Sequence, residues 1–279
     1  MKIKYQIPSL YHALFPSGIL DMDPVENIAT CDSCAMAPPR REDKAETIWY
    51  RGDLKCCTYH PFLPNYLIGA LFSDPKTPQY ILKELRRKIA VREFALPIGM
   101  TAPTAYQIPF TQRTEFEFGQ REDWLCPYFN KAENNCGIWR WRDAVCTGFI
   151  CKSSYGKKGE SFWKMLEEYL AYVELALLEE CLIRLDFSPR EISVSLPLIS
   201  KFEGEDDESQ AMRMTPEEAR GYWKKDSYQD IEGFYKKTYE IVCSLKEHEF
   251  KEAMGDQGLI IEKDLFAHYK KMTSVGKKR

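Results

Sequence analysis

The sequence predicts an α+β fold that is predominantly helical and has an irregular cysteine-rich metal-binding core. Eight of the ten cysteines lie in the first 151 residues, among charged and polar side chains. Apolar residues recur at helical spacing in the second half of the chain. We therefore expect a cysteine-rich metal-binding region over 1–158 and a mainly helical region over 159–279, packed on each other as one globular unit.

The composition limits the cellular compartments and the classes of partner that can be expected. With 44% hydrophobic and 29% charged residues, the 279-residue chain has the composition of a globular protein, and its net charge of −3 gives no reason to expect nucleic acid as a partner. No apolar run reaches the roughly 18 residues of a membrane-spanning helix. The N-terminus lacks a secretory apolar core. We expect a cytoplasmic protein without membrane contact, in which metal binding or redox chemistry explains ten cysteines better than disulfides do.

Three clusters of cysteines form the expected metal site. The predicted ligands are Cys31, Cys34, Cys56, Cys57, Cys126, Cys136, Cys146 and Cys151. Because charged and polar residues separate them, simple burial of free cysteines is the weaker explanation. The other two, Cys181 and Cys243, stand alone in helix-patterned segments, and we expect both to be small core residues.

The spacing within the first two clusters favours different roles. Between Cys31 and Cys34 a tight turn can aim both sulfurs at one ion, although redox dithiols share this spacing. Adjacent Cys56 and Cys57 point to opposite sides of an extended backbone. They serve two adjacent centres, or one cluster with several metal atoms, or one of them is only buried. His60 follows the pair. We expect it to lie beside the ligands, and ligation by His60 is the less favoured alternative.

The segment 126–151 carries the most specific pattern. Its Cys-Pro resembles the dipeptide that ends ferredoxin cluster motifs. The segment also resembles the zinc- or iron-chelating family known by its CxxCxxCC motif (YkgJ-type proteins), to which flagellin lysine N-methylase is related. The matching positions, in a resemblance that covers about 31–151, are Cys126, Pro127, Tyr128, Phe129, Cys136, Ile138, Trp139, Arg142, Cys146 and Cys151. The family separates its CxxC and CC by two residues, whereas twenty-one intervene here.

The resemblance implies roles for two residues that lie between the ligands. Arg142 and Trp139 fall at matching positions, where the arginine would offset the negative charge of several thiolates and hydrogen-bond sulfur. The alternative is that Trp139 packs on the core and Arg142 forms a surface ion pair. Both residues are therefore candidates for the surroundings of the metal, and neither is a candidate ligand.

Local signals place the other elements of the fold. Helices are expected over 75–91, from Ser161 to before Phe187, after Thr215 and over 231–245. A short strand is expected over 47–50, and a short strand or hairpin at the alternating residues 114–118. Apolar residues at i+3 and i+4 steps predict the first, second and fourth helices. The third begins with a capping box that has proline at the first helical position. The glutamates that interrupt the apolar positions of the second helix are expected on a solvated face.

Two classes of function stay open. In the first, the cysteines hold an iron–sulfur cluster, such as a 4Fe–4S cluster, with a redox or modifying role on a protein or small molecule. In the second, they hold Zn2+ in a structural site, and the protein is a partner-binding module. Structural zinc sites usually pair two CxxC knuckles, and only one occurs here, so the spacing favours iron–sulfur. The sequence does not decide whether the protein is an enzyme.

Overall fold

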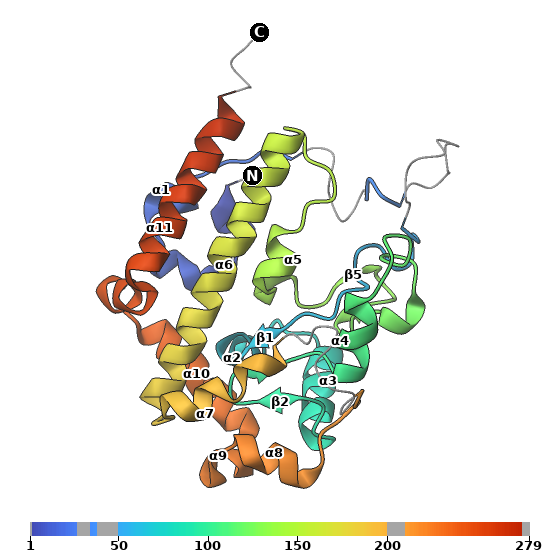
Figure 1. Cartoon of the computed structure of the whole chain (residues 1–279), viewed down its shortest axis with the longest axis vertical. Helices are drawn as coiled ribbons and strands as arrows, with labels where there is room; N and C mark the ends of the chain where they lie inside the picture. The colour runs from blue at the N-terminus through green and yellow to red at the C-terminus, as the bar shows by residue number, and fades with distance from the viewer. Residues whose placement is uncertain (1, 27–33, 38–49, 200–209, 275–279) are drawn as a thin grey trace.

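Helices dominate the computed structural model, which describes residues 2–26, 34–37, 50–199 and 210–274 (Figure 1). The α-helices are α1 (Ser17–Leu20), α2 (Asn65–Ser73), α3 (Gln79–Ala90), α4 (Thr104–Thr111), α5 (Ala144–Gly148), α6 (Lys157–Arg184), α7 (Pro189–Ser193), α8 (Pro216–Tyr222), α9 (Lys225–Gln229), α10 (Ile231–Ser244) and α11 (Glu247–Thr273). The strands are β1 (Leu63–Pro64), β2 (Ala95–Leu96), β3 (Gly99–Met100), β4 (Phe129–Asn130) and β5 (Asn135–Cys136). The prediction of a predominantly helical α+β protein is confirmed.

The strands form two small antiparallel sheets. One has the order β1-β3-β2 and places Leu63 opposite Met100. The other is the β4–β5 hairpin, in which Phe129 lies opposite Cys136. Strands of two residues contribute little stability by themselves. Their effect here is to fix the loops that they terminate.

The strand predicted over 114–118 is wrong, because this segment forms turns. The Glu117 carboxylate accepts hydrogen bonds from the backbone N–H of Thr114 at 2.8 Å and from its hydroxyl at 3.0 Å, which closes the segment on itself. Phe116 is 65% exposed, so the alternation of aromatic and acidic residues does not mark a buried sheet face. Of the other predicted strand, only Tyr50 belongs to the described residues.

The helices predicted from local sequence form where they are expected. α6 buries the apolar positions that its periodicity predicts, and α3 and α10 occupy the two other segments of helical spacing. At the start of α8 the Thr215 hydroxyl accepts a hydrogen bond from the Glu218 N–H, and the Glu218 carboxylate accepts one from the Thr215 N–H at 2.7 Å. The predicted capping box is thereby confirmed.

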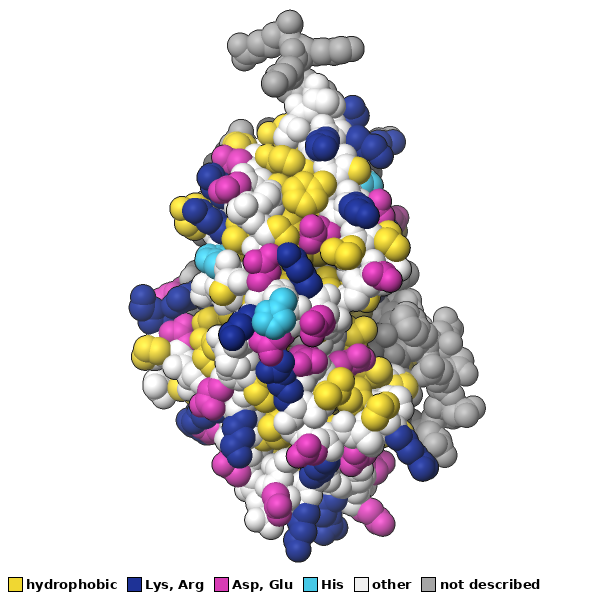
Figure 2. Space-filling model, turned by 90° about the vertical axis from the view of Figure 1, so that its left-hand side faces the viewer, with side chains coloured by type: hydrophobic (Ala, Val, Ile, Leu, Met, Phe, Trp, Pro, Cys, Tyr) yellow, Lys and Arg dark blue, Asp and Glu magenta, His cyan; other side chains and the backbone are white. Residues whose placement is uncertain are grey.

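Two helix pairs build much of the core. α6 and α11 lie side by side, and α10 packs on α2 (Figure 1). Gly69 permits the second contact, because a Cβ at this position would lie 1.9 Å from the Tyr235 carbonyl oxygen. On the face shown in Figure 2, acidic and basic side chains are interspersed. Among the described residues, no helix has both the length and the apolar content that crossing a membrane demands.

The N-terminal segment packs with the long helices, although it precedes the cysteines in the chain. Phe15 stacks on Phe250 of α11, with ring centroids 5.8 Å apart, and meets Tyr169 of α6 edge-on at 5.3 Å. One cluster of buried apolar residues includes side chains from before and after residue 158. The regions expected over 1–158 and 159–279 therefore share a hydrophobic core.

Candidate metal centre

Backbone hydrogen bonds join the adjacent cysteines to the 126–151 segment. The Cys126 N–H donates to the Cys57 carbonyl at 2.8 Å, although the two residues are far apart in the sequence. Cys57 closes a turn by donating its own N–H to the Leu54 carbonyl at 3.1 Å. On the other side, the Phe129 N–H donates to the Cys126 carbonyl at 3.0 Å. Two tight turns thus meet at this contact and bring distant cysteines into one loop region.

The β4–β5 hairpin holds Cys136 near Cys126. After Cys136, the Gly137 N–H donates to the Tyr128 carbonyl at 2.9 Å and extends the pairing. Position 137 favours glycine, because a Cβ there would lie 2.8 Å from the Tyr128 carbonyl oxygen, a backbone atom that cannot move aside. Burial, and then the charge of Cys136, raise the pKa of the Cys126 thiol well above its ordinary range. The two thiols are therefore electrostatic neighbours.

Asp143 positions the third cysteine of this segment. Its carboxylate caps α5 by accepting a hydrogen bond from the Cys146 N–H at 3.0 Å. Burial is the largest cause of the raised pKa of the Cys146 thiol, and the charges of Asp143, Cys126 and Cys136 add to it. These contacts and the backbone bond to Cys57 define a set that we name the inner group: Cys57, Cys126, Cys136 and Cys146.

A second set of cysteines lies around Tyr50. The Tyr50 N–H donates to the Met36 carbonyl at 2.6 Å and so ties the turn that contains Cys34 to the start of the next described segment. Burial, and then the charges of Cys151, Cys56 and Cys34, raise the pKa of the Tyr50 hydroxyl. Burial, Cys34 and Cys56 also raise the pKa of the Cys151 thiol to about 11. We name Cys34, Cys56 and Cys151 the outer group.

A chain of aromatic rings runs from one group to the other. Tyr106 stacks on Phe110 with centroids 5.2 Å apart, Phe110 meets Phe118 edge-on at 6.3 Å, and Phe118 meets Tyr50 edge-on at 5.4 Å. Burial, and to a smaller extent two inner-group thiols, raise the pKa of Tyr106. The outer-group thiols act on Tyr50 in the same way. The two ends of the ring chain therefore border different cysteines.

Arg142 is buried between backbone carbonyl groups. It is 7% exposed, and its guanidinium donates to the carbonyls of Trp139 at 3.2 Å, Cys146 at 3.1 Å and Gln6 at 3.3 Å. It also lies over the ring of Trp139, 3.4 Å from the centroid, while Trp139 is 42% exposed. Trp139 thus covers the guanidinium and does not pack on the core. The contact with Cys57 and burial raise the pKa of the Cys56 thiol, and the charge of Arg142 offsets a small part of that rise.

His60 is buried and has a partner that the sequence prediction missed. Its Nε2 lies 3.3 Å from the Nζ of Lys88, a fully buried lysine that donates to Glu93 at 2.5 Å. The His60 N–H donates to the Tyr106 hydroxyl at 2.8 Å. Burial, and then the charges of Lys88 and Arg87, lower the pKa of His60 well below its ordinary value. The sequence did contain a signal for this contact, because Lys88 occupies a core-facing position in the helical pattern of α3.

Two buried carboxyl groups beside the inner group were also missed. The glutamates of α6 are not all on a solvated face, since Glu174 is 5% exposed and accepts a hydrogen bond from the Ala144 N–H. Burial, and then the charge of Asp143, raise the pKa of Glu174. Burial likewise raises the pKa of Asp143, which is 2% exposed, to about 6. The local net charge at this place therefore depends on pH.

The two isolated cysteines behave differently. Cys181 is fully buried on α6, and its thiol donates to the Thr238 carbonyl at 3.4 Å, so the prediction of a core residue is confirmed. The same prediction is wrong for Cys243, which is exposed. Residue spacing placed it on α10, but the side of the helix that it occupies does not face the core. Every cysteine among the described residues is a free thiol.

The cysteine thiols are suitable ligands for a soft metal, although the described side chains are not arranged around a common point. Cys31 lies outside the described residues, and the seven other predicted ligands are all partly buried free thiols. Thiolates are the preferred ligands of zinc and of iron–sulfur clusters. In the part of the chain that the structure describes, no three His, Cys, Asp or Glu side chains converge closely enough to hold an ion.

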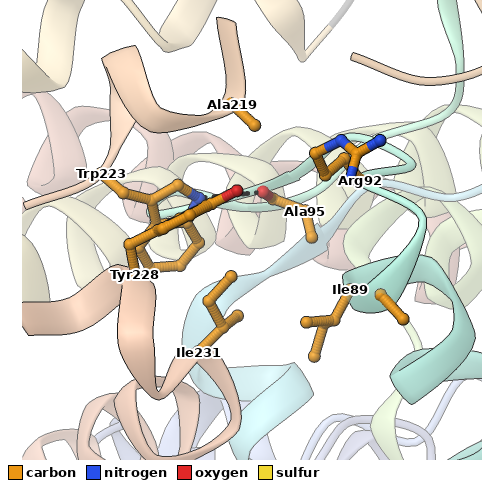
Figure 3. Close-up of a pocket in the computed structure, with 8 residues that line it drawn as sticks. Ile89, Arg92, Ala95, Ala219, Trp223, Tyr228 and Ile231 are labelled. Carbon is orange, nitrogen blue, oxygen red and sulfur yellow. Dashed lines mark hydrogen bonds between the residues drawn. The ribbon is translucent and has the colours of Figure 1, made fainter. Parts of the chain in front are cut away.

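A pocket of about 210 Å³ lies elsewhere, and none of the predicted site residues lines it (Figure 3). Trp223 and Tyr228 face Arg92 across the opening. The Trp223 Nε1–H donates to the Ala95 carbonyl at 3.2 Å, and the Arg92 Nε–H donates to the Met214 carbonyl at 3.2 Å. These bonds attach α8 and the turn before it to β2, so the polar groups of the lining serve the packing of the fold.

Comparisons of the chain with protein-family models, with curated proteins and with solved structures gave no match.

Proposed function

We propose that this protein binds metal through its clustered cysteines, most readily as an iron–sulfur cluster with a redox or modifying role. The observation that carries the proposal is the gathering of cysteines from three separate segments into one loop region, anchored by the hydrogen bond from Cys126 to Cys57. Free thiols that only filled a core would not need such long-range convergence between polar loops. A cytoplasmic location, where thiols stay reduced, belongs to the same proposal.

The choice of iron–sulfur over zinc rests on spacing and on the resemblance of 126–151 to the CxxCxxCC family. One CxxC is present, and the other cysteines follow irregular spacings with a Cys-Pro, which suits an irregular cluster cradle better than paired zinc knuckles. A structural zinc site in a partner-binding module is the second candidate. The shortness of the strands around the cysteines favours it, because such loops need a cross-link to hold their shape.

Residues around the thiols supply what a bound group would need. Several thiolates on one metal carry excess negative charge, and buried Arg142 brings a permanent positive charge beside Cys56. The ring chain from Tyr106 to Tyr50 lines one side of this region with aromatic side chains. An iron–sulfur cluster, when bound, supplies one-electron redox chemistry. The chain's own part is to hold the sulfurs, offset their charge and limit solvent.

Anaerobic purification followed by elemental analysis tests the proposal. The expected result is a brown protein that absorbs at about 400 nm and contains iron and acid-labile sulfide. Zinc without sulfide would instead support the structural-site alternative. Cys136→Ser should lower the metal content, whereas Cys243→Ser, which alters an exposed thiol outside the clusters, should leave it unchanged. A wild-type protein that contains no metal, and takes up none after reduction, would contradict the proposal.

A further inference from the structure

The number of buried thiols exceeds what one centre can use. A structural zinc ion takes four protein ligands, or three and a water where one position stays open, and a 4Fe–4S cluster takes four cysteines. The inner group alone supplies four thiols, and the outer group adds three more that are also partly buried. A single mononuclear or cubane centre on the inner group would therefore leave the whole outer group without a role.

Each group has a scaffold of its own. The inner group is held by the Cys126–Cys57 backbone bond, the β4–β5 hairpin and the Asp143 cap of α5. The outer group is held around Tyr50, which bonds to Met36 and contacts Phe118. Phe118 in turn contacts Phe149, near Cys151, with centroids 5.7 Å apart. The two scaffolds meet at the peptide that joins Cys56 to Cys57.

The electrostatic neighbours of the thiols divide in the same way. The cysteine charges that act on Cys146 come from Cys126 and Cys136, both in the inner group. Those that act on Cys151 come from Cys34 and Cys56, both in the outer group. The main neighbour of the Cys56 thiol is Cys57, in the other group, so the two sets meet at this adjacent pair. Elsewhere the geometry of the scaffolds and the grouping of charges agree on the same two sets.

From this arrangement we infer that the cysteines hold two metal centres, one on the inner group and one on the outer group, with Cys57 serving the first and Cys56 the second. The inference rests on the proposed function and deepens it. Adjacent residues can supply one ligand to each of two neighbouring sites without both sulfurs having to reach one ion. The aromatic chain that ends at Tyr106 and Tyr50 lies against both centres and shields each from solvent.

Anaerobic titration of the reduced, metal-free protein with cobalt(II) tests the count. Cobalt(II) accepts the same tetrahedral thiolate sites as zinc, and its thiolate complexes absorb light, so the endpoint gives the number of ions per chain. The expected endpoint is two ions for the full wild-type chain. An endpoint of one ion overturns the inference and leaves the proposed function standing. A protein that binds no cobalt also overturns the inference, and the proposed function fails with it only if the anaerobically purified protein contains neither iron nor zinc, so the two failures are distinguishable.

Substitutions then separate two independent centres from one shared cluster. Cys136→Ser in the inner group and Cys151→Ser in the outer group should each lower the endpoint from two ions to one, and the double variant should bind none. Cys243→Ser, at an exposed thiol outside both groups, is the matched control and should keep two. Loss of both ions in either single variant would mean one shared cluster and would overturn the inference. If a variant fails to fold by circular dichroism, Cys146→Ser or Cys34→Ser replaces it within the same group.

Discussion

The long helices and the cysteine-bearing loops are stabilised by different interactions. On α6, Leu166, Leu177 and Leu182 are fully buried, and the backbone of the helix satisfies its own hydrogen bonds. In the loops, Arg142 and Asp143 are buried, several thiols are partly buried, and the strands are only two residues long. Loop backbone groups find partners across the chain, as Cys126 does at Cys57.

This difference indicates which part of the molecule the proposed metal would stabilise. Apolar burial is non-directional and is complete in the helical part without any ligand. The loops, in contrast, bury thiols whose pKa values are raised by burial and by one another, as at Cys126 and Cys146. Under the proposed function, a metal would displace the thiol protons, and its positive charge would allow neighbouring thiolates to lie close together. We therefore expect the loops to respond to metal and the helices to packing.

Metal removal should give the largest and most local effect. Chelation of the anaerobically purified protein should lower the free energy of unfolding by several kcal/mol, since structural metal sites contribute roughly 10–16 kcal/mol of binding free energy. Amide hydrogen exchange should accelerate over 122–151 and stay slow in the centre of α6. Uniform acceleration through both parts would show that the loops and the helices unfold as one unit, and would contradict a separate dependence of the loops on metal.

Leu177→Ala should destabilise the helical part of the protein and leave the metal content unchanged. Leu177 is fully buried on α6, and truncation of such a leucine costs about 2–5 kcal/mol of unfolding free energy. Ile183→Ala on the same helix is the control, because Ile183 is 55% exposed and should cost less than about 1 kcal/mol. Urea unfolding measures both. The metal content of the folded Leu177→Ala protein should equal that of the wild type, and a lower content would show that helix packing sets the site.

Arg142→Leu should lower both the free energy of unfolding and the affinity for metal. The change leaves three carbonyl groups without their charged donor, which we expect to cost about 1.5–3 kcal/mol. Metal affinity should fall roughly 10- to 100-fold, as expected for a residue that supports the ligands. Arg140→Leu is the matched control. Arg140 is paired with Asp74 and its side chain is 51% exposed, so its loss should cost at most about 1 kcal/mol. If the metal affinity of Arg142→Leu is unchanged, Arg142 stabilises the backbone of the loops but does not affect the metal.

Glu174→Gln should have the smallest effect, visible as a pH dependence. The raised pKa of Glu174 means that the folded protein keeps a proton that the unfolded chain releases at lower pH. The free energy of unfolding should therefore fall as pH rises above the ordinary carboxyl range. Glutamine still accepts the Ala144 N–H and does not titrate. The variant should match the wild type near pH 4 and exceed its stability near pH 8, measured by urea unfolding. Parallel curves would show that burial does not perturb this carboxyl.

Elements whose signals are local were predictable. The capping box at Thr215, the periodicity of α6 and the burial of Cys181 depend on residues within a few positions of each other. The strand expected over 114–118 failed because a short side-chain bond, from Thr114 to Glu117, competes with extended structure. Alternation alone does not detect such a bond.

The sequence by itself determined that the fold is mostly helical, where α3, α6, α8 and α10 lie, and which cysteines are candidate ligands. It did not predict α2 or α11, which pack on α10 and α6. Only the tertiary structure decided which cysteines are neighbours, that Glu174 is buried, that Cys243 is exposed and that Lys88 reaches His60. The physical reason is range. Helix formation is governed by bonds four residues apart, whereas the grouping of thiols depends on contacts such as Cys126 to Cys57, which form only when loops from distant parts of the chain close on a common core.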